Sequence, residues 1–222
     1  MFDADGRPLH VVWKYDRAEI LADAVVHLIG LAFGLAGAFA LVILATLYAS
    51  TAVTRAVVVY GFCLVGLLCA SAAYNMWPVS RTKWMLRRLD HAFIFLLIAA
   101  TYTPFMTRLP PGLKSTMLFM GVWAVALFGA ALKLVLPGRF DRLSIALCLI
   151  LGGSGALAWD VVAVALPGTT LALIVVGALI YAGGVVFHLW ESLRFQNAVW
   201  HSFVLVASAV FYSAILQGVV LA

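Results

Sequence analysis

The chain has 222 residues, of which 65% are hydrophobic and only 10% are charged, and its mean hydropathy is +1.11. About a quarter of the residues in a soluble globular domain are charged, so this composition excludes a soluble domain and indicates an integral membrane protein. Cys63, Cys69 and Cys148 all lie inside apolar runs. We therefore interpret them as packing residues and expect no disulfide framework.

Seven apolar stretches are long enough to cross the roughly 30 Å of hydrocarbon in a bilayer as helices. The first is far longer than the ~7–15 apolar residues of a signal peptide, which predicts a retained span. In the fifth, a glycine-rich run at 152–155 and the charge of Asp160 interrupt the apolar pattern. The predicted fold class is all-α, with a polar tail at 1–19 and a single seven-helix transmembrane bundle at 20–222. The expected spans are 20–48, 56–76, 89–106, 116–136, 143–164, 169–189 and 198–221.

The distribution of lysine and arginine predicts how the bundle crosses the membrane. The N-terminal tail and the second, fourth and sixth loops share one side and hold 11 of the 14 basic residues. By the positive-inside rule, the N-terminus is cytosolic and the C-terminus is external. We expect a multi-pass protein of the cell's inner (plasma) membrane. The net charge of +5 then follows from topology, so we expect membrane lipids as partners and no nucleic acid. The basic residues on the external side are Arg55, Arg108 and Lys114.

Polar side chains within the spans gather at the predicted cytosolic ends. In the first span, Glu19, Asp23 and His27 are spaced four apart and share one helix face. Ionisable groups at membrane depth are costly, and by default they indicate a functional site. The other spans contribute Ser71, Asn75, Asp90, His91, His188, Asn197 and His201.

Two alternatives apply to some of these residues. Glu19, His91 and His188 lie at the very edges of their spans, where headgroups solvate polar side chains and no shared site is needed. Asp90 lies close in sequence to Arg87 and Arg88, so a structural ion pair is an alternative role for it.

Several of these residues belong to blocks that together resemble a known family. The blocks are Glu19-x3-Asp23-x3-His27, Ser71-x2-Tyr74-Asn75, Asp90-His91, Thr101-Tyr102-Thr103-Pro104 and Asn197-x3-His201. With these blocks in this order, the sequence is similar to the hemolysin III family of bacterial integral membrane proteins, which are relatives of the progestin and adipoQ (adiponectin) receptors. The Asp90-His91 and Thr101-Tyr102-Thr103-Pro104 blocks are quite specific, and the other blocks support them.

The resemblance implies a zinc site near the cytosolic face, but with a degraded motif. The family's three histidine ligands map to Asn75, Asn197 and His201, and an aspartate and a serine of the same cluster map to Asp90 and Ser71. Only His201 keeps the histidine. The chain also has Asp23 where the family commonly has asparagine.

Asparagine at two ligand positions favours the loss of zinc. Imidazole nitrogen binds zinc well, whereas an amide carbonyl suits calcium or magnesium better. In this interpretation Asn75 and Asn197 form hydrogen bonds within a metal-free cluster of polar side chains. The alternative is a rebuilt zinc site that uses His201 and Asp90 with Asp23, His27 or His188.

Three functions remain open. The first is membrane lipid sensing or homeostasis through the cytosolic polar site. The second is a zinc-dependent hydrolase of lipid amides, similar to ceramidases, with Asp90 and Ser71 as candidate catalytic residues. The third is a pore or transporter, which should have polar residues along its whole length. Here they crowd the cytosolic third, and the outer parts contribute little beyond Ser154, Asp160 and Gln217.

Overall fold

The computed structural model describes residues 15–136, 138 and 140–222, and each of the seven predicted spans is helical in it. Seven helices are long and apolar enough to cross a membrane, which confirms the predicted fold class. The direction of crossing stays a prediction. The helices are α1 Arg17–Tyr48, α2 Thr51–Met76, α3 Arg81–Met106, α4 Leu113–Val135, α5 Asp141–Gly153, α6 Trp159–Ala165, α7 Gly168–Leu189 and α8 Gln196–Ile215.

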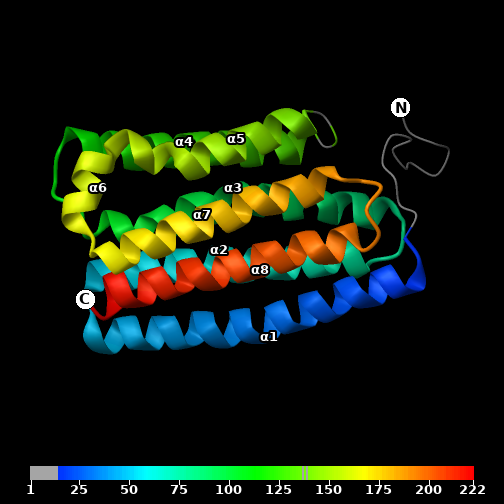
Figure 1. Ribbon diagram of the computed structural model, residues 1–222, viewed down its shortest axis with the longest axis horizontal. Helices are drawn as coiled ribbons and strands as arrows, with labels where there is room; N and C mark the ends of the chain where they lie inside the picture. The colour runs from blue at the N-terminus through cyan, green and yellow to red at the C-terminus, as the bar shows by residue number, and fades with distance from the viewer. Residues whose placement is uncertain (1–14, 137, 139) are drawn as a thin grey trace.

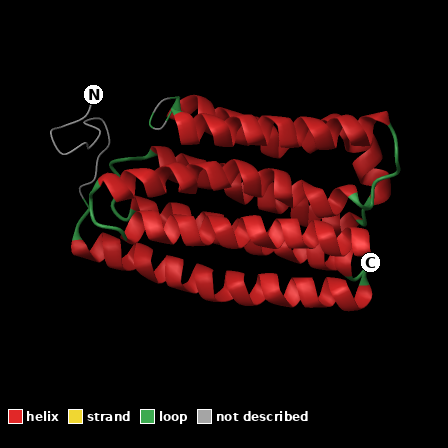
Figure 2. Ribbon diagram, turned by 180° about the vertical axis from the view of Figure 1, so that it is seen from behind, coloured by secondary structure: helices red, strands yellow, loops and turns green. Residues whose placement is uncertain are grey.

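The long helices run side by side, and short loops join them at the two ends of the bundle (Figure 1). In both views α1 lies at one side of the bundle, while α4 and α5 lie at the opposite side (Figure 2). α1 packs against α2 and α8, α2 packs against α3, and α7 packs against α8. As a result, the first turns of α1 and α8, the last turn of α2 and the first half of α3 meet at one end of the bundle.

Close packing of α1 on its neighbours depends on glycine. A Cβ atom on Gly34 would collide with the side chain of Leu68 of α2, and one on Gly37 would touch Tyr212 of α8. Small residues allow helix backbones to approach each other in a membrane, where water provides no hydrophobic force between helices. This close approach brings Glu19, Asp23 and His27, which form the polar stripe of α1, within reach of α8. The opposite face of α1 is exposed and apolar, as expected for a lipid-facing surface, with Phe33 and Phe39 among its exposed residues.

The spans begin before the residues predicted from hydropathy, and the capped starts of α3 and α1 show why. α3 starts at Arg81, where the hydroxyl of Ser80 accepts a hydrogen bond from the backbone N–H of Lys83. α1 starts at Arg17 with a capping box, in which Asp16 and Glu19 each accept a hydrogen bond from the other's backbone N–H. Side-chain caps satisfy the free N–H groups of a first turn, so polar turns extend a membrane helix beyond its apolar part.

The fifth span, expected as one stretch over 143–164, is broken at the glycine-rich run. α5 ends at Gly153, a 3₁₀ segment follows at Ser154–Ala158, and α6 continues the span. The hydroxyl of Tyr102 on α3 lies at the break, where it accepts a hydrogen bond from the Gly155 N–H at 3.0 Å and donates to the Gly152 carbonyl at 2.8 Å. The Tyr102 hydroxyl therefore forms hydrogen bonds with backbone groups that lipid could not satisfy.

Candidate functional site

Three ionisable side chains meet inside the bundle, and we refer to Asp23, His27 and His201 as the Asp–His cluster. Asp23 and His27 lie one turn apart on α1, and His201 lies opposite them on α8. Asp23 Oδ1 is 2.6 Å from His201 Nδ1, and Asp23 Oδ2 is 3.5 Å from His27 Nε2. The two imidazole rings are 4.5 Å apart between centroids. One potential ligand atom from each residue lies within 4.8 Å of the others, so the cluster could hold a metal ion.

The cluster is almost sealed from its surroundings. Asp23 is 3% exposed and His27 is 6% exposed, and the side chain of His201 is 13% exposed. A buried carboxylate requires a partner, and here the short contact with His201 Nδ1 provides it. When the ring is neutral and Asp23 is ionised, Nδ1 carries the proton that it donates, which leaves the lone pair of His201 on Nε2.

Asn75 and Asn197 do not join the cluster. The Asn75 side-chain amide donates to the Ser71 carbonyl oxygen at 2.9 Å and to the Ser71 hydroxyl at 3.4 Å, both one turn back on α2. Asn197 hydrogen-bonds to the phenol of Tyr15. Burial raises the pKa of Tyr15, so this phenol stays neutral and available as a hydrogen-bonding group.

Asp90 lies on α3 behind the cluster and is buried, with 7% of its surface exposed. The Ser71 side chain hydrogen-bonds to its carboxylate, and it is close enough to His201 and His27 to interact with them electrostatically. Arg87, the alternative partner considered above, instead donates to Asp141 Oδ2 at 3.0 Å. Asp90 and Ser71 thus share one network beside the Asp–His cluster.

The two other histidines considered for the site lie outside the cluster. His188 packs its ring against Trp200, with 4.9 Å between centroids. His91 meets the edge of Tyr74 at 6.4 Å. The structure therefore selects His27 and His201 from the histidines that the sequence left open.

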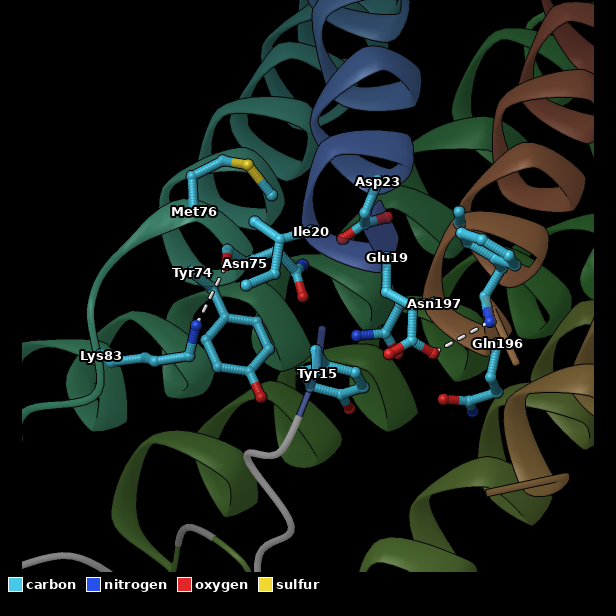
Figure 3. Close-up of a pocket in the computed structure, with 12 residues that line it drawn as sticks. Tyr15, Glu19, Ile20, Asp23, Tyr74, Asn75, Met76, Lys83, Gln196 and Asn197 are labelled. Atoms are coloured by element: carbon cyan, nitrogen blue, oxygen red, sulfur yellow. Dashed lines mark hydrogen bonds between the residues drawn. The ribbon is translucent and has the colours of Figure 1, made fainter. Parts of the chain in front are cut away.

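A cavity of about 30 Å³ opens at this end of the bundle, and its lining includes Asp23, Asn75 and Asn197 (Figure 3). That volume holds one or two water molecules. Asn75 and Asn197 thus form part of the wall of a small cavity between the Asp–His cluster and the loops. The other lining residues are Tyr15, Glu19, Ile20, Tyr74, Met76, Lys83, Phe195, Gln196 and Ala198.

Hydrogen bonds fix the rim of this cavity. Lys83 Nζ donates to the carbonyl oxygen of Asn75 at 3.0 Å (Figure 3). It also donates to the carbonyl oxygen of Trp77 at 2.9 Å, at the end of α2. Glu19 Oε1 accepts from the Phe195 N–H at 3.0 Å, which ties α1 to the start of α8. Glu19 is therefore more than an interfacial residue. The sequence pattern does not single out Tyr15, Lys83 and Gln196. The Asp16-x2-Glu19 spacing, typical of a capping box, is the one signal that could have pointed to an ordered start of α1 beside Tyr15.

Comparison with known proteins identifies the family. A family model described as "Haemolysin-III related" matches residues 19–212. The "Hemolysin-3 homolog" of Bacillus subtilis (strain 168) is 31% identical over 198 residues, which cover 89% of this chain and 93% of that protein. Hemolysin-3 of Bacillus cereus is 31% identical and covers 89% and 90%. The human "Monocyte to macrophage differentiation factor" is 30% identical over 166 residues, which cover 71% of this chain and 67% of that protein. The chain thus belongs to the hemolysin III family and is a multi-pass protein of the plasma membrane.

Proposed function

We propose that this protein acts in membrane lipid sensing or homeostasis through the polar site at the end of the bundle predicted to be cytosolic. The observation that supports this most directly is the burial of Asp23, His27 and Asp90 beside a small polar cavity in an otherwise apolar bundle. Keeping ionisable groups inside a membrane protein costs free energy, so a site that retains them has a functional reason to do so.

The position of the cavity suits a site that faces lipid headgroups. It lies where α1, α2 and α8 reach the loops, and its lining combines carboxylate, amide and phenol groups. Such groups can bind water and the polar atoms of a headgroup, while the apolar outer faces of the helices remain in contact with acyl chains.

The test is a deletion strain complemented with variants. Loss of the gene should change membrane fluidity or lipid composition, and wild-type protein should restore both. Asp23→Asn should restore them less well, whereas Asp160→Asn, at an exposed ion pair with Lys114, should restore them fully. An unchanged membrane in the deletion strain would count decisively against a role in lipid homeostasis.

The second candidate is hydrolysis of a lipid amide, and the donor set of the Asp–His cluster favours it. Two imidazoles and one carboxylate form a ligand set of catalytic zinc, and a bound zinc ion would supply a water of lowered pKa. Asp90 and Ser71 lie close by and could hold a proton and orient a polar substrate atom. Release of free fatty acid from a ceramide by purified, zinc-loaded protein would establish this activity; no release would leave the first proposal standing.

A pore is the least supported candidate. The buried charge-bearing side chains of the described residues, Asp23, His27, Lys83, Asp90 and Lys133, lie at one end of the bundle. The core around Leu64 and Ile215 is apolar and closely packed. A conduction path needs polar groups along its length. We expect no ion flux through the protein in liposomes.

A further inference from the structure

We infer that Asp23, His27 and His201 form a binding site for a divalent transition-metal ion such as zinc, assembled by α1 and α8. The family-type ligand positions at Asn75 and Asn197 do not fit zinc, because an amide carbonyl oxygen is a weak zinc ligand. The amide nitrogen of Asn75 donates to its own helix, and Asn197 hydrogen-bonds to Tyr15. His201 would be a ligand in both the family-type site and the site formed with Asp23 and His27. This inference stands independently of the lipid function proposed above.

The first argument is the donor set and its geometry. A tetrahedral zinc ion with ligands at roughly 2.1 Å separates its ligand atoms by about 3.4 Å. In the structure, Asp23 Oδ2 and His27 Nε2 are already 3.5 Å apart. Asp23 Oδ1 and His201 Nδ1, at 2.6 Å, share a proton, and widening this contact by less than an ångström would allow a metal ion to replace that proton.

The second argument is an unsatisfied atom. His27 Nε2 is buried, and within the described part of the chain it has no hydrogen-bond partner. It faces the Asp23 carboxylate. A buried polar nitrogen without a partner is costly, and a metal ion between these groups would use its lone pair. A hydrogen bond between Asp23 and His201 satisfies those two residues and leaves His27 Nε2 with only its longer, 3.5 Å contact to Asp23 Oδ2.

The third argument is charge balance. The bundle buries two carboxylates near these imidazoles, those of Asp23 and Asp90. A divalent cation bound by neutral imidazoles would compensate both carboxylates at once, as burial of charge requires. Asp23 also lines the small cavity at this end of the bundle, so a metal ion that entered the cavity would meet the Asp23 carboxylate.

The experiment measures metal binding directly, without relying on activity. Full-length protein purified in detergent is analysed for metal content, and the metal-free protein is titrated with Co²⁺, whose tetrahedral complexes absorb visible light. We expect about one zinc per wild-type chain and a tetrahedral Co²⁺ spectrum. Asp23→Asn and His27→Gln should each lower the affinity by at least about tenfold.

Matched controls separate this site from the family-type positions and from misfolding. Asn75→Ala and Asn197→Ala should retain the metal, and Asp23→His should also retain it, because a third imidazole replaces the carboxylate. Each variant is compared by size-exclusion profile and helix content, so that unfolded protein is recognised. Wild-type protein that binds neither zinc nor Co²⁺ would overturn the inference, as would undiminished binding by folded Asp23→Asn and His27→Gln.

Discussion

Asp23 Oδ1 on α1 lies 2.6 Å from His201 Nδ1 on α8, which joins the first and last membrane helices across 178 positions of sequence. The contact is buried, so it differs from a surface ion pair, whose charges are solvated and screened. It closes the bundle at the end where α1, α2, α3 and α8 meet, and it holds the polar stripe of α1 against the helix that carries His201.

Removing the carboxylate should therefore destabilise the bundle even without metal. Asp23→Ala leaves His201 Nδ1 without its partner, and loss of a buried partner costs about 1–3 kcal/mol. Thermal unfolding of the detergent-solubilised protein in the presence of a chelator measures this. The control is Asp160→Ala, which removes an ion pair with Lys114 in which both side chains are more than 60% exposed. Its unfolding temperature should stay close to that of wild type, because water solvates both exposed charges. An Asp23→Ala variant that unfolds at the same temperature as wild type would show that Asp23 does not stabilise the fold.

Restoring histidine at the two asparagine positions tests how the sites are related. Asn75→His with Asn197→His supplies two imidazoles near His201, a donor set that zinc prefers to amides. The double variant should bind zinc more tightly than wild type, by about tenfold or more, but with unchanged stoichiometry because both arrangements use His201.

Metal content is measured for wild type, for the double variant and for each with His201→Ala added. Zinc present only in the double variant would show that the wild-type chain has lost its metal, which was the interpretation favoured by the sequence. Two zinc ions in the double variant would show that the two arrangements do not share His201.

The ion pairs between α3, α4 and α5 lead to a third prediction. Lys133, which is only 3% exposed at its side chain, lies 2.6 Å from Asp141 Oδ1, and Arg87 lies 3.0 Å from Asp141 Oδ2. Asp141→Asn leaves the buried ammonium without its counter-ion, whereas Lys133→Met leaves Asp141 paired with Arg87. We expect Asp141→Asn to lower the unfolding midpoint more than Lys133→Met does, because an unpaired buried charge costs more than an apolar replacement. A larger fall in the unfolding midpoint for Lys133→Met than for Asp141→Asn would mean that water solvates the Lys133 ammonium.

The sequence was sufficient to predict the seven spans, because hydropathy and length report directly on the hydrocarbon that each helix crosses. It missed the starts of α1 and α3, where the polar caps at Asp16 and Ser80 extend the helices. It placed Asp23, His27 and His201 at one depth, from helical spacing and topology. It could not show that Asp23 contacts His201, or that Arg87 binds Asp141 rather than Asp90. The rotation of each helix about its axis depends on packing contacts between helices, such as that of the Leu68 side chain on Gly34.

The break in the fifth span provides the last prediction. Tyr102→Phe removes the hydroxyl that accepts from the Gly155 N–H and donates to the Gly152 carbonyl, and it leaves the ring in place. Losing these bonds should cost about 0.5–1.5 kcal/mol, and the effect should be local because the apolar contacts of the ring remain. Hydrogen exchange should accelerate at Gly155 and its neighbours in the 3₁₀ segment, and it should be unchanged in α1 and α8. Unaltered exchange at Gly155 would show that the 3₁₀ segment is held by packing alone, and that the phenol does not stabilise the break.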